Sequence, residues 1–200
     1  MPNRCGRPSK GAENNSKDKI IGTAIAIIKK NGADAVTVRK VCSAAGLSIG
    51  TFYHYFRDKD DLLMHFLRET AFDQELDAPV SDVPGRITEL YMRLVDRYMD
   101  LGLDFMKSFY STGNRSLSAY MGEVDGKFTA GTVMERCEEE MNIALETGYI
   151  KNGTDIHTVC MDICTIVKGC VFEWCLNDAR PDIEKVLSRI IRNYMGAYLA

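Results

Sequence analysis

The sequence predicts an all-α protein, with a head of short helices followed by a body of longer ones. Apolar residues recur at i, i+3, i+4 and i+7 along most of the 200-residue chain, which is the spacing of one helix face. No stretch of useful length alternates between apolar and polar residues as a half-buried strand does, and no internal repeat is present. Turn and cap signals divide the predicted helices from one another.

The first segment, residues 1–15, is rich in Gly, Pro, Asn, Lys and Arg and is predicted to be a flexible basic arm. Ser16 is a suitable N-cap for the first helix, whose apolar residues repeat every three to four positions up to Ile28. The pair Asn31-Gly32 then ends this helix with a glycine stop.

Two short helices follow, separated by a glycine turn. Thr37 caps the first, TVRKVCSAA, and Gly46 ends it with a positive φ. Ser48 caps the second, SIGTFYHYF, in which Phe52 and Phe56 lie four residues apart and are predicted to face inward. A short helix, a glycine-containing turn and a second short helix together form a helix-turn-helix motif.

The body begins with a fourth helix, which Asp58 caps and in which Asp61 is a capping-box-like acid. A linker is expected at residues 77–85. One apolar stripe then runs over residues 87–98, and residues 103–126 are predicted to hold a short helix and a loop.

Three further helices complete the body. The first is expected from about Lys127 to Thr147, and the last two have broad apolar stripes over residues 156–174 and 183–198, with Pro181 in the first turn of the final helix. These stripes offer more apolar surface than a small helical core needs, so a second copy of the chain is expected to cover the surplus. The predicted homodimer interface comprises Ile163, Val167, Val171, Ile183, Leu187, Ile190, Ile191 and Tyr194.

The charge of the chain is distributed unevenly, although its net charge is only −3. Residues 1–59 hold 11 Lys and Arg against 4 Asp and Glu, a net charge of +7, whereas residues 60–200 hold 14 against 24, a net charge of −10. A basic head on an acidic body indicates that the head meets a polyanion, either nucleic acid or an anionic membrane surface. A chance imbalance on solvated faces is the alternative interpretation.

The second short helix of the motif crowds hydroxyls, an imidazole and aromatic rings together. Hydroxyl and imidazole groups donate to phosphate oxygens or base edges, and an apolar side chain such as Ile49 contacts a thymine methyl. Gly50 would let the helix approach a duplex closely. The pattern therefore predicts a DNA-contacting helix, against the alternatives that Tyr53 is a half-buried packing ring and His54 merely a solvent-exposed histidine.

The stretch TVRKVCSAAGLSIGTFYHYFRDKDDL resembles, without gaps, the DNA-binding signature of the TetR (tetracycline-repressor-like) family of bacterial transcription regulators. The resemblance spans roughly residues 16–70 and extends less closely over residues 144–199. It implies an all-α fold with an N-terminal three-helix helix-turn-helix DNA-binding domain over residues 16–58. A C-terminal helical domain for effector binding and dimerisation would then occupy residues 59–200.

The resemblance also implies which residues bind DNA and what the protein does. The expected DNA-binding residues include phosphate contacts and, in Ser48, Ile49 and Thr51, the side chains nearest the bases. The implied function is that of a sequence-specific transcriptional regulator, a homodimeric repressor that a small-molecule effector releases from a pseudo-palindromic operator in double-stranded DNA. The full set of expected DNA-binding residues is Thr37, Arg39, Ser48, Ile49, Gly50, Thr51, Tyr53, His54 and Lys59.

The body of such a regulator binds a small effector, so its aromatic and methionine residues are candidates for an adaptable apolar pocket. An apolar or aromatic ligand is expected there. At helical spacing the same residues are also ordinary core, and the sequence leaves both interpretations open. The candidate pocket residues are Tyr91, Tyr98, Met99, Phe105, Phe109, Met134 and Trp174.

Other classes of function are disfavoured. No nucleophile–base–acid arrangement, P-loop or dinucleotide fingerprint is present, so neither an enzyme nor a cofactor is expected. The absence of a membrane span or signal peptide and the odd number of seven cysteines predict a cytoplasmic chain with reduced thiols.

Two alternatives stay open. The first is a helical protein-interaction module on the same fold. The second is a thiol or metal sensor, because His157, Cys160 and Cys164 share a helix face. Cysteine in an apolar stripe more often serves as a small hydrophobe, so no metal site is predicted. The run Glu138-Glu139-Glu140 is expected to be a solvated helix face.

Overall fold

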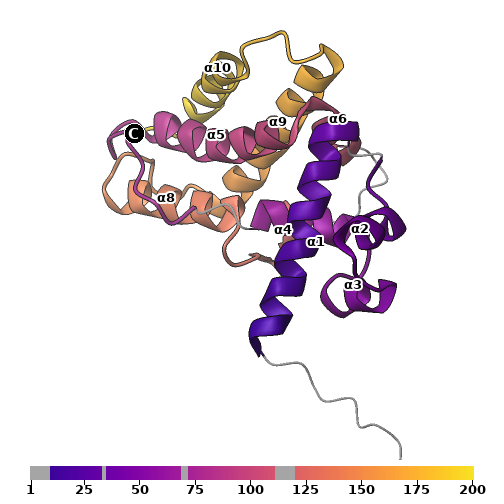
Figure 1. Ribbon diagram of the computed structural model, residues 1–200. Helices are drawn as coiled ribbons and strands as arrows, with labels where there is room; N and C mark the ends of the chain where they lie inside the picture. Colours follow the sequence, from indigo (N-terminus) through magenta and orange to yellow (C-terminus); the bar gives the residue numbers. More distant parts are fainter. Residues whose placement is uncertain (1–9, 33–34, 69–71, 111–119) are drawn as a thin grey trace, which may run out of the picture. The chain divides into compact units, whose positions relative to one another are not determined.

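The computed structural model describes residues 10–32, 35–68, 72–110 and 120–200 (Figure 1). Within these residues the chain is helical apart from loops and one short two-stranded hairpin, which confirms the all-α prediction. No helix among them combines the length and the apolar character needed to cross a membrane. The chain divides into two compact units, Met1–Leu63 and Met64–Ala200. The functional boundary expected after residue 58 stays a prediction.

Unit 1 is built on α1, Lys10–Asn31, which packs against α2, Val38–Ala45, and α3, Ile49–Tyr55 (Figure 1). The apolar stripe of α1 is buried, because residues three and four apart lie on one face of a helix. The core of this unit includes Ile20, Ala24, Ile27, Ile28, Val36, Val41, Cys42, Ala45, Phe52 and Phe56.

Helix α1 begins earlier than the sequence predicted. It starts at Lys10, so Ser16 is an interior helix residue and its prediction as the N-cap is wrong. No proline follows Pro8 in this stretch, and Ala, Glu and Lys favour a helix, so local propensity outweighs the cap preference of serine. Residues 1–9 of the predicted arm lie outside the described residues.

The turn between α2 and α3 has the predicted caps. Thr37 Oγ1 accepts the N–H of Lys40 at 3.2 Å, and Ser48 Oγ accepts the N–H of Thr51 at 3.0 Å. Gly46 has a φ of 66°, a left-handed conformation in which a Cβ atom would be strained. These contacts fix the start of α3 and leave one of its sides outside the core.

Helix α4, Lys59–Arg68, begins directly after Asp58, as predicted. Asp58 Oδ1 accepts the N–H of Asp61 at 2.8 Å. Asp61 in turn accepts the N–H of Arg57 at 3.0 Å, so the capping acid reaches the residue before the cap. The first turn of α4 is therefore closed by carboxylates of its own chain.

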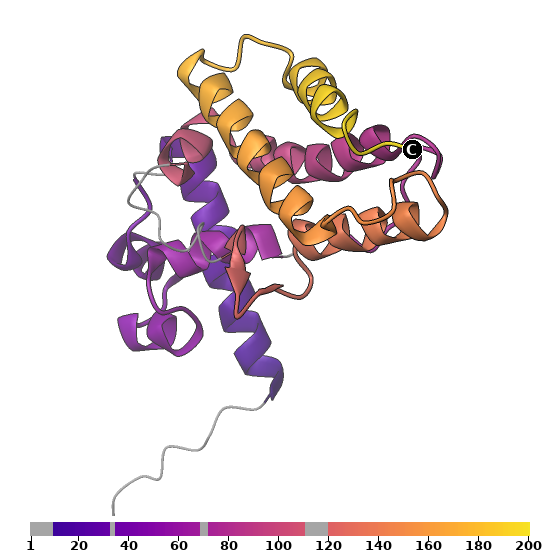
Figure 2. The same ribbon diagram turned by 180° about the vertical axis from the view of Figure 1, so that it is seen from behind.

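Unit 2 contains α5, Val83–Leu101, α6, Leu103–Phe109, α8, Val133–Glu146, α9, Ile156–Leu176, and α10, Ile183–Met195 (Figures 1 and 2). Helix α5 packs against α6, α8 and α10, and α9 packs against the same three helices. The core between them is rich in aromatic rings and sulfur. Its buried residues include Tyr91, Tyr98, Phe105, Met106, Met121, Met134, Cys137, Met141, Cys160 and Cys164.

A hairpin spans the boundary between the predicted loop region and the helix predicted from about Lys127. Strand β1, Glu123–Val124, pairs antiparallel with β2, Lys127–Phe128 (Figure 2). The turn residues Asp125 and Gly126 have φ of 53° and 72°, and Asp-Gly is a sequence signal for a turn with two such residues. Helix α8 starts only at Val133, so the predicted start near Lys127 is wrong.

Two other helix starts also differ from the predictions. Helix α5 begins inside the predicted linker, because Asp82 Oδ1 accepts the N–H of Gly85 at 3.2 Å and so caps the helix there. Pro181 lies before the N-cap of α10, Asp182, and not in the first turn of the helix. An aspartate takes the N-cap position in both cases.

A buried ion cluster joins α5 to α8. Glu140 is only 3% exposed, so the prediction that it lies on a solvated face is wrong. Its Oε2 accepts from Arg86 Nε at 2.7 Å, and its Oε1 lies 2.5 Å from Arg136 Nη2. An unpaired carboxylate would be costly at this depth, whereas two guanidinium groups neutralise the charge of this one.

Candidate nucleic-acid interface

Helix α3 has a buried side and an exposed side. Phe52 and Phe56 are buried, with ring centroids 5.6 Å apart. Tyr53 is 57% exposed, although its ring meets Phe52 edge-on at 5.6 Å. Ile49 and His54 are exposed on the same helix. Tyr53 is therefore not the half-buried packing ring of the alternative interpretation, because most of its side chain contacts solvent.

Ser48 and Thr51 act as one hydrogen-bonding unit, which the sequence did not reveal. Ser48 Oγ accepts the N–H of Thr51 and also lies 2.8 Å from Thr51 Oγ1. One of the two hydroxyl protons is used between them, whichever residue donates it. The pair therefore keeps one hydroxyl proton for an acceptor outside the protein.

Gly50 keeps the exposed side of α3 free of side-chain atoms at its first turn. A Cβ atom added there would meet only Ser48 Oγ, at 3.7 Å, which is ordinary van der Waals contact. The packing of unit 1 therefore does not require glycine at this position. Alanine would favour the helix by about 1 kcal/mol. The glycine therefore does not stabilise the helix, and its effect is to leave the exposed side of α3 open to close approach.

The predicted phosphate contacts outside α3 lie at helix N-termini. Thr37 and Arg39 are exposed at the start of α2, and Lys59 is half-buried at the start of α4. The amide of Asp61 in the first turn of α4 already donates to Asp58. The backbone at this end is thus less available to a phosphate than the sequence suggested, and the ammonium group of Lys59 is the feature that can contact one.

Most of the predicted pocket residues lie in the core of unit 2. Tyr91, Tyr98, Phe105 and Met134 are fully or almost fully buried. The hydroxyl of Tyr91 donates to the Met134 sulfur at 3.3 Å, and the hydroxyl of Tyr98 lies 3.8 Å from the sulfur of Met121. Burial raises the pKa of Tyr91 and of Tyr98 well above the usual value, so both phenols stay neutral hydrogen-bond donors.

The structure does not unite the whole predicted pocket. Met99 is 45% exposed and does not share the buried environment of its neighbour Tyr98. Phe109 lies in α6, and its side chain is outside the described residues. Trp174 borders a surface cavity of about 310 Å³ between α9 and α10. That cavity is lined by Gly169, Cys170, Glu173, Trp174, Pro181, Ile183, Val186, Arg189 and Ile190.

The predicted dimer residues also divide into buried residues and residues near the surface. Five of them, Ile163, Val167, Val171, Leu187 and Ile191, are completely buried within their own chain and cannot contact a partner in this conformation. The predicted stripes face the core of unit 2. Ile183 and Ile190 border the cavity, and the hydroxyl of Tyr194 donates to Asp162 Oδ2 at 2.7 Å.

Two exposed apolar side chains on α9 escaped the prediction. Phe172 is 49% exposed and Leu176 is 63% exposed. They lie four residues apart, outside the stripe that the sequence assigned to the core. An i, i+4 apolar pair beside a complete stripe is the signal of a second apolar face, and it was present in the sequence.

The residues of the alternative thiol or metal sensor have separate partners. His157 contacts Glu123 and Glu138, whereas Cys160 Sγ lies 3.6 Å from the Sγ of Cys137 on α8. The hydrogen bond to Cys160 and burial raise the pKa of Cys137, which keeps this thiol protonated. Within the described residues no group of three or more His, Cys, Asp and Glu side chains has the arrangement of a metal site.

Comparison with known proteins gives the head a family. The family model for bacterial regulatory proteins of the tetR family matches residues 20–65. The chain is 23% identical over 189 residues to a fatty acid metabolism regulator protein of Bacillus subtilis (strain 168), an alignment that covers 86% of this chain and 90% of that protein.

Solved structures share the fold over nearly the whole chain. A TetR transcription regulator from Haloarcula marismortui ATCC 43049 superposes with a TM-score of 0.61 at 19% identity, covering 94% of this chain and 100% of that one. The complex of SmeT with triclosan superposes with a TM-score of 0.59 at 16% identity, covering 93% of this chain and 92% of that one. SmeT is the repressor of a Stenotrophomonas maltophilia multidrug efflux pump. Residues 20–65 match the family model and the fold is shared along nearly the whole chain, so the chain is similar to bacterial regulatory proteins of the tetR family, and its head carries their N-terminal domain.

Proposed function

We propose that the protein is a cytoplasmic, homodimeric repressor without enzymatic activity. It binds a pseudo-palindromic operator and leaves it when an apolar or aromatic ligand binds. The observation that carries this proposal is the division of α3, whose Phe52 is buried while Tyr53 and His54 face solvent. A helix fixed by its own core that exposes a phenol, an imidazole and a hydroxyl pair suits the major groove.

In this proposal the residues around α3 divide between phosphates and bases. Thr37, Arg39, Lys59, Tyr53 and His54 contact phosphates and set the position of the helix on the duplex. The side chain of Ile49 and the free hydroxyl proton of the Ser48–Thr51 pair face the base edges, and Gly50 permits the close approach.

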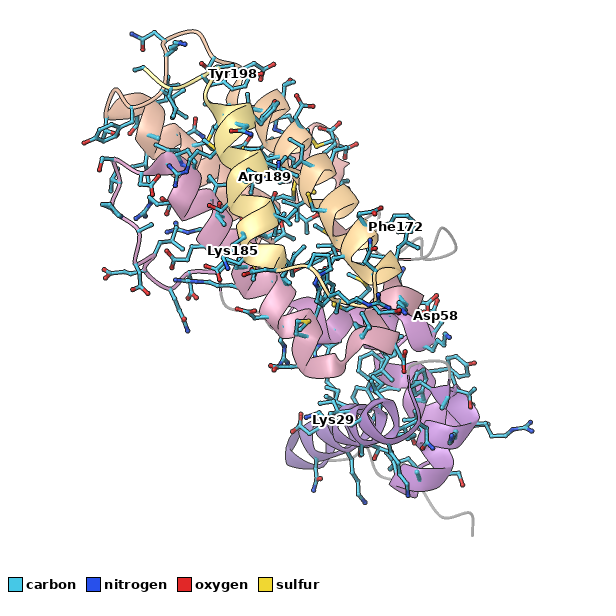
Figure 3. All side chains as sticks on the ribbon, turned by 90° about the horizontal axis from the view of Figure 1, so that it is seen from above. Lys29, Asp58, Phe172, Lys185, Arg189 and Tyr198 are labelled. Atoms are coloured by element: carbon cyan, nitrogen blue, oxygen red, sulfur yellow. The ribbon has the colours of Figure 1, made fainter. Side chains whose placement is uncertain are left out.

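The surface of α9 and α10 supports pairing with a second copy. Figure 3 shows the two helices side by side and labels Phe172 on α9 and Arg189 on α10. In the proposed dimer Phe172 and Leu176 of one copy enter the cavity between α9 and α10 of the other, and the two-fold axis repeats the contact. Arg189 and Glu173 both border the cavity, so opposite charges can meet across the axis.

The ligand is proposed to bind beside Tyr91 and Tyr98 in unit 2. Their neutral phenols and the neighbouring methionine sulfurs form an apolar environment that holds two hydrogen-bond donors. An apolar ligand with one acceptor suits this environment. The triclosan complex of SmeT and the fatty acid metabolism regulator of Bacillus subtilis support a ligand of this kind.

A footprint on the DNA upstream of the protein's own gene tests the proposal. The expected result is protection of two half-sites whose centres are about 34–36 Å apart, one turn of the duplex. Affinity for this site at physiological salt should exceed that for unrelated DNA of equal length by roughly a thousand-fold or more. Equal affinity for both would contradict the proposal and favour a protein-interaction module.

A further inference from the structure

His157, in the first turn of α9, is held by carboxylates from two other elements. Its Nδ1 lies 2.7 Å from Glu138 Oε1 on α8, and its Nε2 lies 2.8 Å from Glu123 Oε2 on β1. Its ring also stacks on Phe128 of β2, with centroids 4.3 Å apart and planes 16° apart. One imidazole therefore connects the β1–β2 hairpin to both α8 and α9.

This arrangement requires a protonated histidine. A carboxylate only accepts hydrogen bonds, so each of the two ring nitrogens must carry a proton to bond to its partner. A neutral imidazole has one N–H and would turn a lone pair toward the other carboxylate. The attraction between the cationic ring and the face of Phe128 would also be lost with the proton.

The charged groups around His157 favour the cation. Glu138 faces it from α8, Glu123 faces it from β1, and Asp155 lies at the N-cap of its own helix. Lys127 belongs to the opposite side of β2 from Phe128, because successive side chains of a strand alternate. The hydrogen bonds to Glu123 and Glu138 raise the pKa of His157 above its ordinary value of about 6.5.

The pH dependence follows from this direction. Because the folded protein binds the proton more tightly than the unfolded chain, the stabilisation by His157 is complete below about pH 6.5. It is lost as the pH rises through the raised pKa. The three contacts of the imidazole therefore weaken together as the ring loses this proton.

The hairpin has a second attachment that does not involve His157. Met121, just before β1, is fully buried, and its carbonyl oxygen accepts from Lys168 Nζ on α9 at 2.8 Å. The hydroxyl of Tyr98 lies 3.8 Å from the Met121 sulfur. The base of the hairpin is thus anchored in the core, and His157 holds its strands.

We propose that His157 is a proton-operated latch, which holds the β1–β2 hairpin against α8 and α9 when protonated and releases it when neutral. Release is local, because the anchor at Met121 and the helix contacts of α8 with α9 remain. The latch itself does not depend on DNA binding.

Hydrogen exchange of the full-length protein between pH 6 and pH 9 tests the latch. After correction for intrinsic exchange, the amides of residues 123–128 should lose roughly ten-fold in protection, the effect of one lost charge-assisted hydrogen bond at a partly exposed site. The midpoint should equal the pKa of His157 measured by NMR titration. Protection independent of pH, or an equal loss in α8 and α9, would overturn the proposal.

Three variants separate the latch from a general effect of pH. His157→Phe keeps the ring stack but has no N–H groups, so hairpin protection should be low at every pH. Glu123→Ala should give the same result, because it removes the carboxylate that bonds the imidazole to the hairpin. Glu139 is an exposed carboxylate on α8 that pairs with Arg136. The variant Glu139→Gln should therefore retain the pH profile of the unaltered protein. Unaltered profiles in the first two variants would also overturn the proposal.

Discussion

Tyr53 shows how one side chain serves both the fold and the surface. The edge contact with Phe52 orients the ring, and the phenol lies beyond the packed part of unit 1. A ring held on one side loses little conformational freedom when it binds a partner, which lowers the entropic cost of the contact. The hydroxyl can donate to a phosphate without any rearrangement of the core.

Tyr53→Phe and His54→Ala should each weaken operator binding by roughly ten-fold, the loss of one hydrogen bond to a charged group. Their thermal midpoints should stay within about 2 °C of the unaltered protein, because neither polar group is buried. Tyr149→Phe, a tyrosine 41% exposed in unit 2, is the matched control and should bind DNA normally. Fluorescence anisotropy with labelled operator measures the affinities. Unchanged affinity in both α3 variants would remove this face from the interface.

At the residue scale the sequence predicted which side chains cap helices better than it predicted which side chains bond to one another. The capping residues Ser48 and Thr37 were found from local preference alone. The mutual hydrogen bond of Ser48 and Thr51 was not, because a hydroxyl rotor has several acceptors within reach and only coordinates select one. His157 likewise has partners 19 and 34 residues away, which no local pattern encodes.

Among the contacts between elements, the buried cluster of Arg86, Arg136 and Glu140 joins α5 to α8 most directly. Arg86 also donates to the carbonyl oxygen of Ala78 at 2.6 Å, which ties the segment before α5 to the same cluster. Arg86 depends on this buried carboxylate for neutralisation, whereas Arg136 also pairs with the exposed Glu139.

Glu140→Gln should destabilise the protein by about 3–5 kcal/mol, since it leaves the guanidinium group of Arg86 near the core without its carboxylate, while Arg136 keeps only the exposed Glu139. Urea denaturation followed by circular dichroism measures the change. Glu139→Gln is the control: this neighbour pairs with the same Arg136 at 2.9 Å but is exposed, and its loss should cost less than about 1 kcal/mol. Equal free energies of unfolding for the two variants would show that the buried cluster stabilises the protein no more than an exposed ion pair does.

At the element scale the stripes predicted which helices exist, and the caps predicted several of their ends. The errors lie where two signals competed. Asp125-Gly126 is a hairpin signal inside a region assigned to loop and helix, and the two-residue strands were too short for alternation to show. Glu140 was assigned to solvent because a charge run is usually exposed, and its partner Arg86 is 54 residues away.

For the molecule as a whole, the stripes of α9 and α10 turn out to serve the monomer. The apolar stripes of α9 and α10, which suggested a partner molecule, are covered within the chain, because α8 packs on α9 and α5 packs on α10. Periodicity identifies the buried face of a helix but cannot tell a neighbour in the same chain from a second copy. The large apolar side chains that stay exposed on α9 are Phe172 and Leu176.

Phe172→Glu should convert the proposed dimer to a monomer at micromolar concentration, because it places a carboxylate in the apolar cavity of the partner. Sedimentation velocity measures the state. Operator affinity should fall by roughly a hundred-fold, since each head must then bind its half-site alone. Tyr149→Glu alters an apolar residue of similar exposure elsewhere in unit 2 and should leave the dimer intact. A dimeric Phe172→Glu protein with normal helicity would place the interface elsewhere.

The buried thiols of unit 2 have a practical consequence for the molecule in solution. Cys137 and Cys160 face each other in the core, and Cys164 is buried beside them. The thiolate is the nucleophile that attacks an alkylating reagent, so these buried sulfurs react only when the surrounding helices separate. The rate at which iodoacetamide labels them therefore reports how often the core opens. A bound ligand that stabilises unit 2 would lower this labelling rate.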